Sequence, residues 1–393
     1  MPKSENSKCD CPADLPQIIA QIASHFHVLP RQLGLAPIRH GTLERNNVWR
    51  LTIKGHPYLL KQHLIARPVG ESIFTPFRVE SLVLSTLYQA DCPVPKIHWQ
   101  SESSLCLLLA WGGNITLDDL AQETPPEGLK PTIRKVVRAL CQLEDRFAKS
   151  AHAIKPYVYP LHYPEFLHRG TRGLLDRGRK MMNYLASLTG QPMSAKQQAA
   201  INEIWGRMSN RLYNAVPTLG RLDYNARNVV VDGDAPTFID FGSVGWDWGQ
   251  RRLVQSLNSL GANRFGGNFI CLLDQGIVRE YSDQIAKLQA VPISDREEIA
   301  AQVDYHNLLF YLSIVYRLVQ ATVQREDPEN RSLLKAWGNA KARFQCAVDL
   351  LVDSRLSDDP DARQIREFVG EFRDASEQKS HKRDNIQGCA FLR

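Results

Sequence analysis

Two short apolar runs near residue 230 interrupt the long helical part of this sequence. Residues 228–231 and 237–239 have the composition of strands, and the turn residues Asp232, Gly233 and Asp234 separate them. The sequence on both sides has helical apolar spacing, which is clearest at 133–147, 167–188, 194–213 and across much of 250–353. The pattern therefore predicts a β-hairpin inside a mainly helical domain.

The first third of the chain has a different pattern. It predicts a helix within 15–33, strands at 48–53 and 58–63, a second helix at 77–89 and a strand at 105–110. This separation of β-rich and helical segments predicts an α+β fold of two lobes, with a small β-rich N-lobe and a larger, mainly helical C-lobe. We predict four regions, namely a tail and capping helix at 1–34, the N-lobe at 35–112, the C-lobe at 113–360 and a polar C-terminal tail at 361–393.

The composition excludes several classes of protein. Hydrophobic residues make up 43% and charged residues 23% of the 393 residues, which disfavours disorder, collagen and repeat arrays. The most apolar stretch, 308–319, is interrupted by Ser313 and Arg317, so we expect no membrane span. The eight cysteines are scattered and the N-terminus lacks the apolar core of a signal peptide, which favours a cytoplasmic protein.

Three oxygen-bearing side chains lie next to the predicted hairpin strands. Asp223 precedes Asn228 by five positions, and the second apolar run leads directly into Asp240. Phosphoryl transfer needs a carboxylate that faces the attacking hydroxyl and hard oxygen ligands for magnesium near the transferred phosphate. The hairpin can supply both kinds of group.

These residues resemble the motifs of the aminoglycoside phosphotransferase and choline kinase superfamily, which has a protein-kinase-like fold. The family pattern is His-Gly-Asp followed five positions later by Asn, and here it is matched by the segment 221–228; the metal motif is matched by Ile239-Asp240-Phe241. The resemblance implies an enzyme that uses ATP and Mg²⁺. It also implies that Asp223 is the catalytic base and that Asn228 and Asp240 are metal ligands.

The resemblance extends upstream and covers roughly residues 35 to 320. It implies that Lys61 grips the nucleotide phosphates and that Glu80 holds Lys61 in place. It also implies that the backbone of Ala110 and Trp111 meets adenine at the hinge, and that Gly41 is the one glycine of the loop that covers the phosphates.

Two departures from the family pattern keep an alternative open. Arg221 and Leu222 stand where His and Gly are usual, and the segment 250–253 stands where a structural Asp is usual. A catalytically impaired pseudokinase that serves as a nucleotide-binding scaffold is therefore the alternative to an active kinase. A nucleic-acid-binding module is disfavoured, because no aromatic stacking platform accompanies the basic residues.

The acceptor is expected to be a small molecule. Residues 131–190 contain eleven Lys or Arg and four acids, a net charge of +7, and this segment helps to build the acceptor pocket in the family. Its charge favours a neutral or anionic acceptor, such as a sugar, a nucleoside or an acidic metabolite, over a cationic aminoglycoside. A solvated helical surface is the simpler interpretation of the same charges. Trp246 and Trp248 either line the acceptor pocket or pack the larger lobe.

Overall fold

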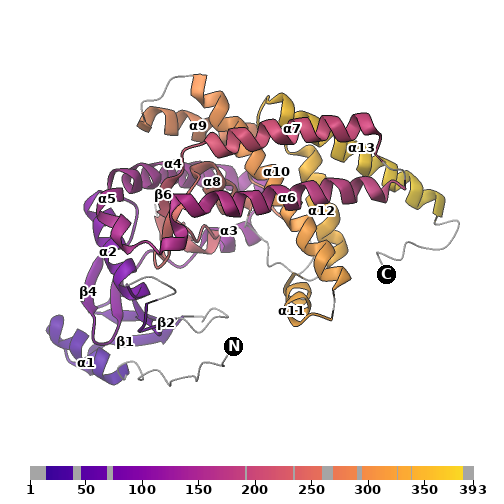
Figure 1. Cartoon of the computed structure of the whole chain (residues 1–393). Helices are drawn as coiled ribbons and strands as arrows, with labels where there is room; N and C mark the ends of the chain where they lie inside the picture. The colour runs from indigo at the N-terminus through magenta and orange to yellow at the C-terminus, as the bar shows by residue number, and fades with distance from the viewer. Residues whose placement is uncertain are drawn as a thin grey trace, which may run out of the picture.

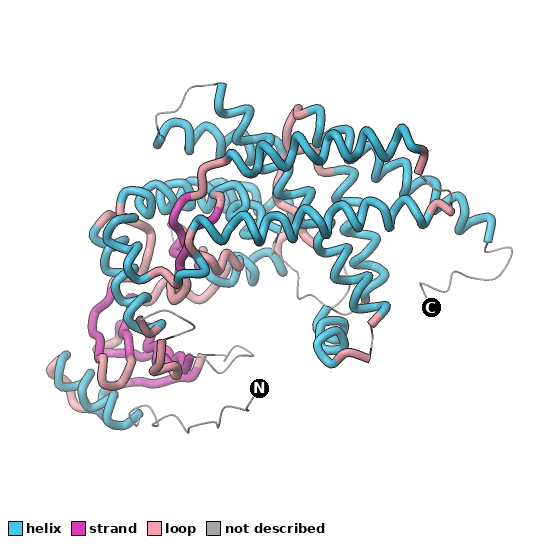
Figure 2. The backbone as a smooth tube through the Cα atoms, viewed as in Figure 1, coloured by secondary structure: helices cyan, strands magenta, loops and turns pink. Residues whose placement is uncertain are grey.

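The chain folds into two lobes of different composition (Figures 1 and 2). The computed structural model describes residues 15–38, 46–68, 74–190, 193–232, 235–258, 269–289, 294–324, 326–337 and 339–383. Most strands lie at the N-terminal end of the molecule, and helices predominate in the rest (Figure 2). The predicted α+β architecture with a β-rich N-lobe and a helical C-lobe is confirmed.

The N-lobe is an antiparallel sheet of five strands with two helices against it. The strand order is β1-β2-β3-β5-β4. The strands span Gly34–Pro37 (β1), Asn46–Ile53 (β2), His56–His63 (β3), Ile97–Ser101 (β4) and Cys106–Ala110 (β5). The helices are α1 (Leu15–His25) and α2 (Pro76–Gln89), and a 3₁₀ turn, η1, spans Pro30–Gln32. The predicted hairpin of β2 and β3 and the predicted strand β5 are present.

The alternation of side chains along β3 decides which groups face the C-lobe. Leu60 and its partner Leu108 are fully buried in a cluster with α1, on one face of the sheet. Because successive side chains point to opposite faces, the next residue, Lys61, lies on the other face with its partner Leu107. Leu107 packs in the cluster that contains the buried residues of α2. Lys61 is thereby placed under α2 and toward the helical lobe.

The C-lobe is built from helices with two small strand pairs. Its helices are α3 (Leu117–Glu123), α4 (Pro126–Lys149), α5 (Ala151–Ile154), α6 (Pro164–Leu188), α7 (Ala195–Asn214), α8 (Gly249–Asn258), α9 (Gln275–Gln289), α10 (Ser294–Val323), α11 (Pro328–Trp337), α12 (Ala340–Asp353) and α13 (Pro360–Arg383). Short 3₁₀ turns span Lys155–Tyr157 (η2), Pro160–His162 (η3) and Ala226–Asn228 (η4). The strand pairs are β6 (Thr218–Arg221) with β9 (Val244–Asp247), and β7 (Val229–Val230) with β8 (Thr237–Phe238). The hairpin predicted near residue 230 is therefore present.

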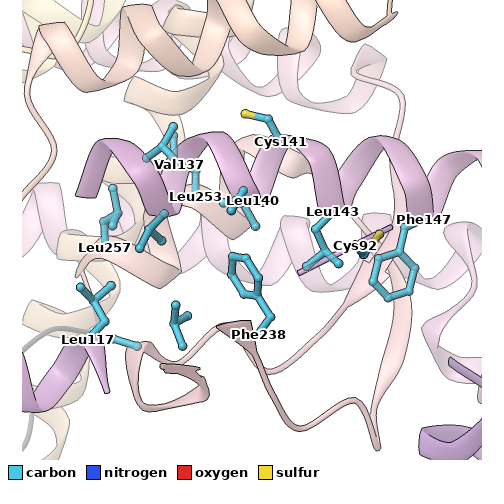
Figure 3. Close-up of a cluster of buried hydrophobic side chains, with 14 of the residues drawn as sticks. Cys92, Leu117, Val137, Leu140, Cys141, Leu143, Phe147, Phe238, Leu253 and Leu257 are labelled. Carbon is cyan, nitrogen blue, oxygen red and sulfur yellow. The ribbon is translucent and has the colours of Figure 1, made fainter. Parts of the chain in front are cut away.

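The long helix α4 forms the centre of the core beside the hairpin of β7 and β8. Figure 3 shows Leu140, Leu143 and Phe147 of α4 directed toward Phe238 and the chain beneath the helix. The ring of Phe147 also lies 6.1 Å from the ring of Phe241, measured between centroids. The same cluster includes the buried residues of α2, so one apolar core connects the two lobes around the hairpin.

A second hydrophobic cluster joins α6, α7, α10, α12 and α13. Four residues of α13 are buried in it, namely Ala362, Ile365, Val369 and Phe372. The segment predicted as a polar tail from residue 361 therefore contains a helix that packs against the C-lobe through these four residues. The segment is polar on average, but its apolar residues recur at intervals of three or four and form one buried helical face.

None of the described helices is both long enough and apolar enough to cross a bilayer.

Candidate active site

Lys61 and Glu80 form a buried ion pair between β3 and α2. The Lys61 ammonium lies 3.0 Å from Oε1 and 2.7 Å from Oε2 of Glu80. Glu80 occupies the buried face of α2 together with Val83, Leu84 and Leu87, at the spacing that brings helical residues to one side. Lys61 is 6% exposed and Glu80 is 0% exposed. The paired arrangement predicted from the sequence is present in the structure.

The pair stays charged at neutral pH. Burial alone lowers the pKa of Lys61, but the carboxylates of Glu80 and Asp240 outweigh it and raise that pKa above its ordinary value. Burial alone raises the pKa of Glu80, but Lys61 and His63 outweigh it and hold that pKa below its ordinary value. Nε2 of His63 lies 3.0 Å from Oε2 of Glu80. An ordered positive charge is therefore fixed at this end of β3.

Asp240 connects this pair to the helical lobe. Its Oδ1 lies 3.0 Å from Nζ of Lys61, and the backbone N–H of Phe241 donates to Oε1 of Glu80 at 3.3 Å. The Asp240 side chain is 41% exposed, unlike the two partners. Its φ of 65° is in the left-handed region, which costs a non-glycine residue about 1–3 kcal/mol. Strain of this kind is typical of functional positions.

Asn228 lies beside Asp240 because of the hairpin. The backbone N–H of Ile239 donates to the carbonyl of Asn228 at 3.0 Å, so the residue before Asp240 is joined directly to Asn228. Their side chains supply an amide oxygen and a carboxylate, which suit magnesium. Among the residues the structure describes, no group of three or more His, Cys, Asp and Glu could hold a metal. A pair of oxygen ligands instead fits the way Mg²⁺ is held jointly by protein and phosphates.

Asp223 follows β6 and lies at the space between the two lobes. It is exposed, and its Oδ1 accepts a hydrogen bond from the backbone N–H of Asn225 at 3.2 Å. The next residue, Tyr224, is 5% exposed and turns into the core. The carboxylate of Asp223 is therefore oriented by one backbone N–H, while the residue stays exposed.

Arg221 joins the strand before Asp223 to both strands of the hairpin. Its Nη1 donates to the carbonyl of Asn228 at 3.1 Å and to the carbonyl of Ile239 at 2.8 Å. The guanidinium lies 5.4 Å from the ring centroid of Phe238 and 5.7 Å from that of Phe241. Burial lowers the pKa of Arg221, although nearby acids including Asp223 oppose this. A residue noted only as a departure from the family pattern thus supports the backbone of Asn228 and the residue before Asp240.

A second buried ion pair, which the sequence did not reveal, supports the other side of the Asp223 loop. Arg252 of α8 donates from Nε to the hydroxyl of Tyr224 at 2.6 Å, and its Nη1 binds Glu144 of α4 and Oγ1 of Thr218. A Cβ at Gly220 would lie 2.5 Å from Cζ of Arg252, so this strand position must be glycine. The segment 250–253, which lacks the expected structural Asp, supplies this arginine.

A cleft of about 250 Å³ lies between the lobes and contains both carboxylates. Asp223 and Asp240 line it, together with aromatic residues that include Phe74, Tyr157 and Tyr159. The rings of Phe74 and Tyr157 pack against each other in its wall, with 4.2 Å between their centroids. Among the described lining residues there is no Lys or Arg. The cleft is therefore acidic and aromatic.

The remaining predicted site residues lie outside this cluster. The N–H of Ala110, the last residue of β5, donates to the carbonyl of Lys96 at 2.8 Å. The ring of Trp111 lies under the guanidinium of Arg50, 5.1 Å from ring centroid to Cζ. Gly41 lies outside the described residues. The contact of Ala110 and Trp111 with adenine stays a prediction.

The tryptophans and the basic segment have different surroundings. Trp248 is 1% exposed and packs in the C-lobe, whereas the half-buried Trp246 lies edge-on to Tyr163. None of the eleven basic side chains between residues 131 and 190 is among the described residues that line the cleft. Arg177 instead lines a different cavity, inside the helical lobe.

The sequence matches the profile of the phosphotransferase enzyme family over residues 34–291. Among curated proteins, none matches it. Similar solved structures include a spectinomycin phosphotransferase with ADP and spectinomycin, at 10% identity, 92% coverage of this chain, 99% of that chain and a TM-score of 0.48. Choline kinase from Cryptosporidium parvum has 9% identity, 94% and 97% coverage and a TM-score of 0.48. A choline/ethanolamine kinase family protein from Mesorhizobium loti has 14% identity, 90% and 98% coverage and a TM-score of 0.43.

Proposed function

This chain belongs to the phosphotransferase enzyme family, as its motifs predicted, and on that premise we propose that it transfers the γ-phosphoryl group of ATP to a hydroxyl of a small molecule. The observation that carries the proposal is the position of the Lys61 ammonium, which reaches Glu80 at 2.7 Å and Asp240 at 3.0 Å. A fixed cation beside an exposed carboxylate suits the binding of a magnesium nucleotide.

Each residue of the cluster has a defined part in this proposal. Glu80 holds Lys61 so that its charge needs no reorganisation when negative charge shifts onto the leaving phosphate. Asn228 and Asp240 would hold Mg²⁺, which neutralises charge on the phosphates when bound. Arg221 keeps the backbone of the two ligands in register through its two carbonyl contacts.

Asp223 would act on the acceptor. Its exposed carboxylate orients the acceptor hydroxyl and takes up its proton as the oxygen attacks phosphorus in line with the leaving ADP. No covalent intermediate on the enzyme is required. The paired rings of Phe74 and Tyr157 form an apolar part of the cleft wall, against which the body of an acceptor would pack.

The cleft favours a neutral acceptor with an apolar or aromatic face. Asp240 is paired with Lys61, but Asp223 has no ion-pair partner among the described residues, so an anionic acceptor would meet repulsion near Asp223. The basic side chains of residues 131–190 do not offset this repulsion, because none of them is among the described residues that line the cleft. We therefore narrow the expected acceptor class to neutral hydroxyl compounds such as nucleosides, aryl glycosides or other sugars.

A panel of acceptors tests this function. The measurement is ADP release from ATP with Mg²⁺ in the presence of nucleosides, sugars, sugar acids, amino alcohols and aminoglycosides. We expect acceptor-dependent release with a neutral compound and a loss of at least about 10³-fold in the Asp223→Ala variant. Equal rates in the variant and the parent protein would exclude Asp223 as the base.

The alternative of a nucleotide-binding scaffold loses its main argument. It rested on Arg221 in place of histidine and on the altered segment 250–253. Arg221 donates to two carbonyls of the hairpin, and the segment 250–253 supplies Arg252, which holds Tyr224 next to Asp223. We therefore favour an active enzyme over a scaffold.

A further inference from the structure

A cavity of about 430 Å³ lies inside the helical lobe, between α6, α8 and α10. We call it the arginine cavity, because Arg177 of α6, Arg251 of α8 and Arg317 of α10 all line it. Figure 1 shows α6 and α10 crossing in this part of the lobe, and the two helices are in direct contact. None of its residues lines the cleft with Asp223 and Asp240.

The charge of the arginine cavity is one-sided. No Asp or Glu is among the described residues that line it. Arg251 is paired with Asp247 at 3.0 Å. Within the described part of the chain, neither Arg177 nor Arg317 has an ion-pair partner. The half-buried Arg177 and the exposed Arg317 therefore present positive charge at the cavity without a described carboxylate partner, and an anion would pair with them.

His306 provides a second and independent sign of a ligand. It is 5% exposed, lines the cavity and packs against Trp248, and its Nε2 has no hydrogen-bond partner among the described residues. Burial and the charge of Arg251 lower the pKa of His306 to about 3, so its ring is neutral at ordinary pH. A buried polar atom without a partner is costly and rare, and a bound molecule would satisfy it.

The rest of the wall is apolar and fits a hydrocarbon body. Leu174, Leu309, Phe310 and Ile314 line the cavity beside the arginines. We propose that the arginine cavity binds a small anion with an apolar body, in which a carboxylate or phosphate group meets the guanidinium groups and His306. This proposal goes beyond phosphoryl transfer and holds whether or not the cleft is active.

The direct test is binding to the full-length protein by calorimetry and by thermal shift. The probes are octanoate and phenylacetate for the carboxylate arm and octyl phosphate and phenyl phosphate for the phosphate arm, with 1-octanol and 2-phenylethanol as uncharged controls. We expect saturable binding of at least one anionic probe and at least tenfold weaker binding of its uncharged counterpart. The arm whose probes bind more tightly, carboxylate or phosphate, identifies the anionic group of the ligand.

Matched variants locate the binding. Arg177→Met and Arg317→Met should each weaken the anionic probe at least fivefold, because each removes one unpaired guanidinium from the cavity. Arg179→Met is the control, since Arg179 is exposed on the same helix and does not line the cavity. His306→Phe should weaken binding while keeping the packing against Trp248. The proposal is overturned if no anionic probe binds, if uncharged probes bind as tightly, or if both arginine variants bind like the Arg179→Met control.

Discussion

Two buried ion pairs of the same chemical type have different surroundings in this molecule. In the N-lobe, Lys61 pairs with Glu80 but also reaches Asp240, whose side chain is 41% exposed in the cleft. In the C-lobe, Arg252 pairs with Glu144, and their side chains are 0% and 6% exposed. The first pair has one side open to a ligand, whereas the second is enclosed by protein.

The difference shows what each pair is for. Every nitrogen of the Arg252 guanidinium donates within the protein, to Tyr224, Glu144, Thr218 and the carbonyl of Gly245. The pair thus fixes the loop that carries Asp223 and has no capacity left for a substrate. Lys61 instead shares its charge with a group that would exchange it for magnesium and phosphate. The enclosed pair therefore serves stability, whereas the open pair is the one that the proposed function assigns to catalysis.

Removing the enclosed pair should have the largest effect on stability. Arg252→Met leaves Glu144 buried without its cation, and we expect a loss of about 4 kcal/mol in the free energy of unfolding. Urea unfolding followed by tryptophan fluorescence measures it. The double variant Arg252→Met with Glu144→Met should recover part of the loss, because no buried charge remains. If Arg252→Met were as stable as the parent protein, the enclosed pair would have no stabilising role to distinguish it from the open pair.

Removing the open pair should affect activity more than folding. Lys61→Met should lower kcat/KM by roughly 10²-fold to 10³-fold, since a fixed charge at the phosphates is lost. The loss of stability should be only about 1–2 kcal/mol, because Glu80 keeps the N–H of Phe241 and the neighbouring His63. Lys96→Met, at an exposed lysine of the same lobe, is the control for both measurements. Full activity in Lys61→Met would contradict the assignment.

Substitution of Arg221 should have an intermediate effect on stability and activity, since Arg221 is buried like Arg252 but borders the site. Arg221→Met leaves the carbonyls of Asn228 and Ile239 without this donor, and we expect about 2 kcal/mol lower stability and roughly tenfold lower activity. Addition of excess Mg²⁺ should restore part of the activity, because the ligand positions are loosened and not removed. Activity unchanged by the substitution would assign Arg221 to folding alone.

The smallest expected effect is that of pH on the open pair. The raised pKa of Lys61 means that its contribution is complete below its ordinary value of 10.5 and is lost only as pH rises through the folded-state value. The lowered pKa of Glu80 means that its contribution is complete above its ordinary value of 4.5 and is lost only as pH falls toward strong acid. The stability difference between the parent and the double variant Lys61→Met with Glu80→Met, which has neither titratable group, should therefore vary by less than about 0.5 kcal/mol from pH 6 to 9. A steady drift across that range would contradict a permanently charged pair.

The sequence predicted the elements whose apolar pattern is strong and local. The helix α2 has a clear helical period, and the strands β2, β3, β7 and β8 are short runs of strand-forming residues bounded by turn residues. Short elements with a weak pattern were missed. All four residues of β1 are exposed, and it contains a glycine and a proline, so its strand conformation depends on pairing with β2.

The buried charges of the site were partly predictable. Lys61 and Glu80 could be placed because a family pattern orders them along the chain. Arg221 and Arg252 could not, because a charged residue is normally exposed and only the tertiary structure shows which carbonyls and carboxylates surround it. Gly220 is a related case, since its need for glycine comes from Arg252, which lies 32 positions later in the sequence.

The most direct test of the account is the thermal stability of three proteins with and without ATP and Mg²⁺. A ligand that binds only the folded state raises the melting temperature by mass action. The open Lys61 and Asp240 site predicts stabilisation of the parent protein, the same stabilisation of Asp223→Ala, and its loss in Asp240→Asn, because Asp240 meets the metal while Asp223 meets only the acceptor. Failure of the magnesium nucleotide to stabilise the parent, or equal stabilisation of Asp240→Asn, would contradict it.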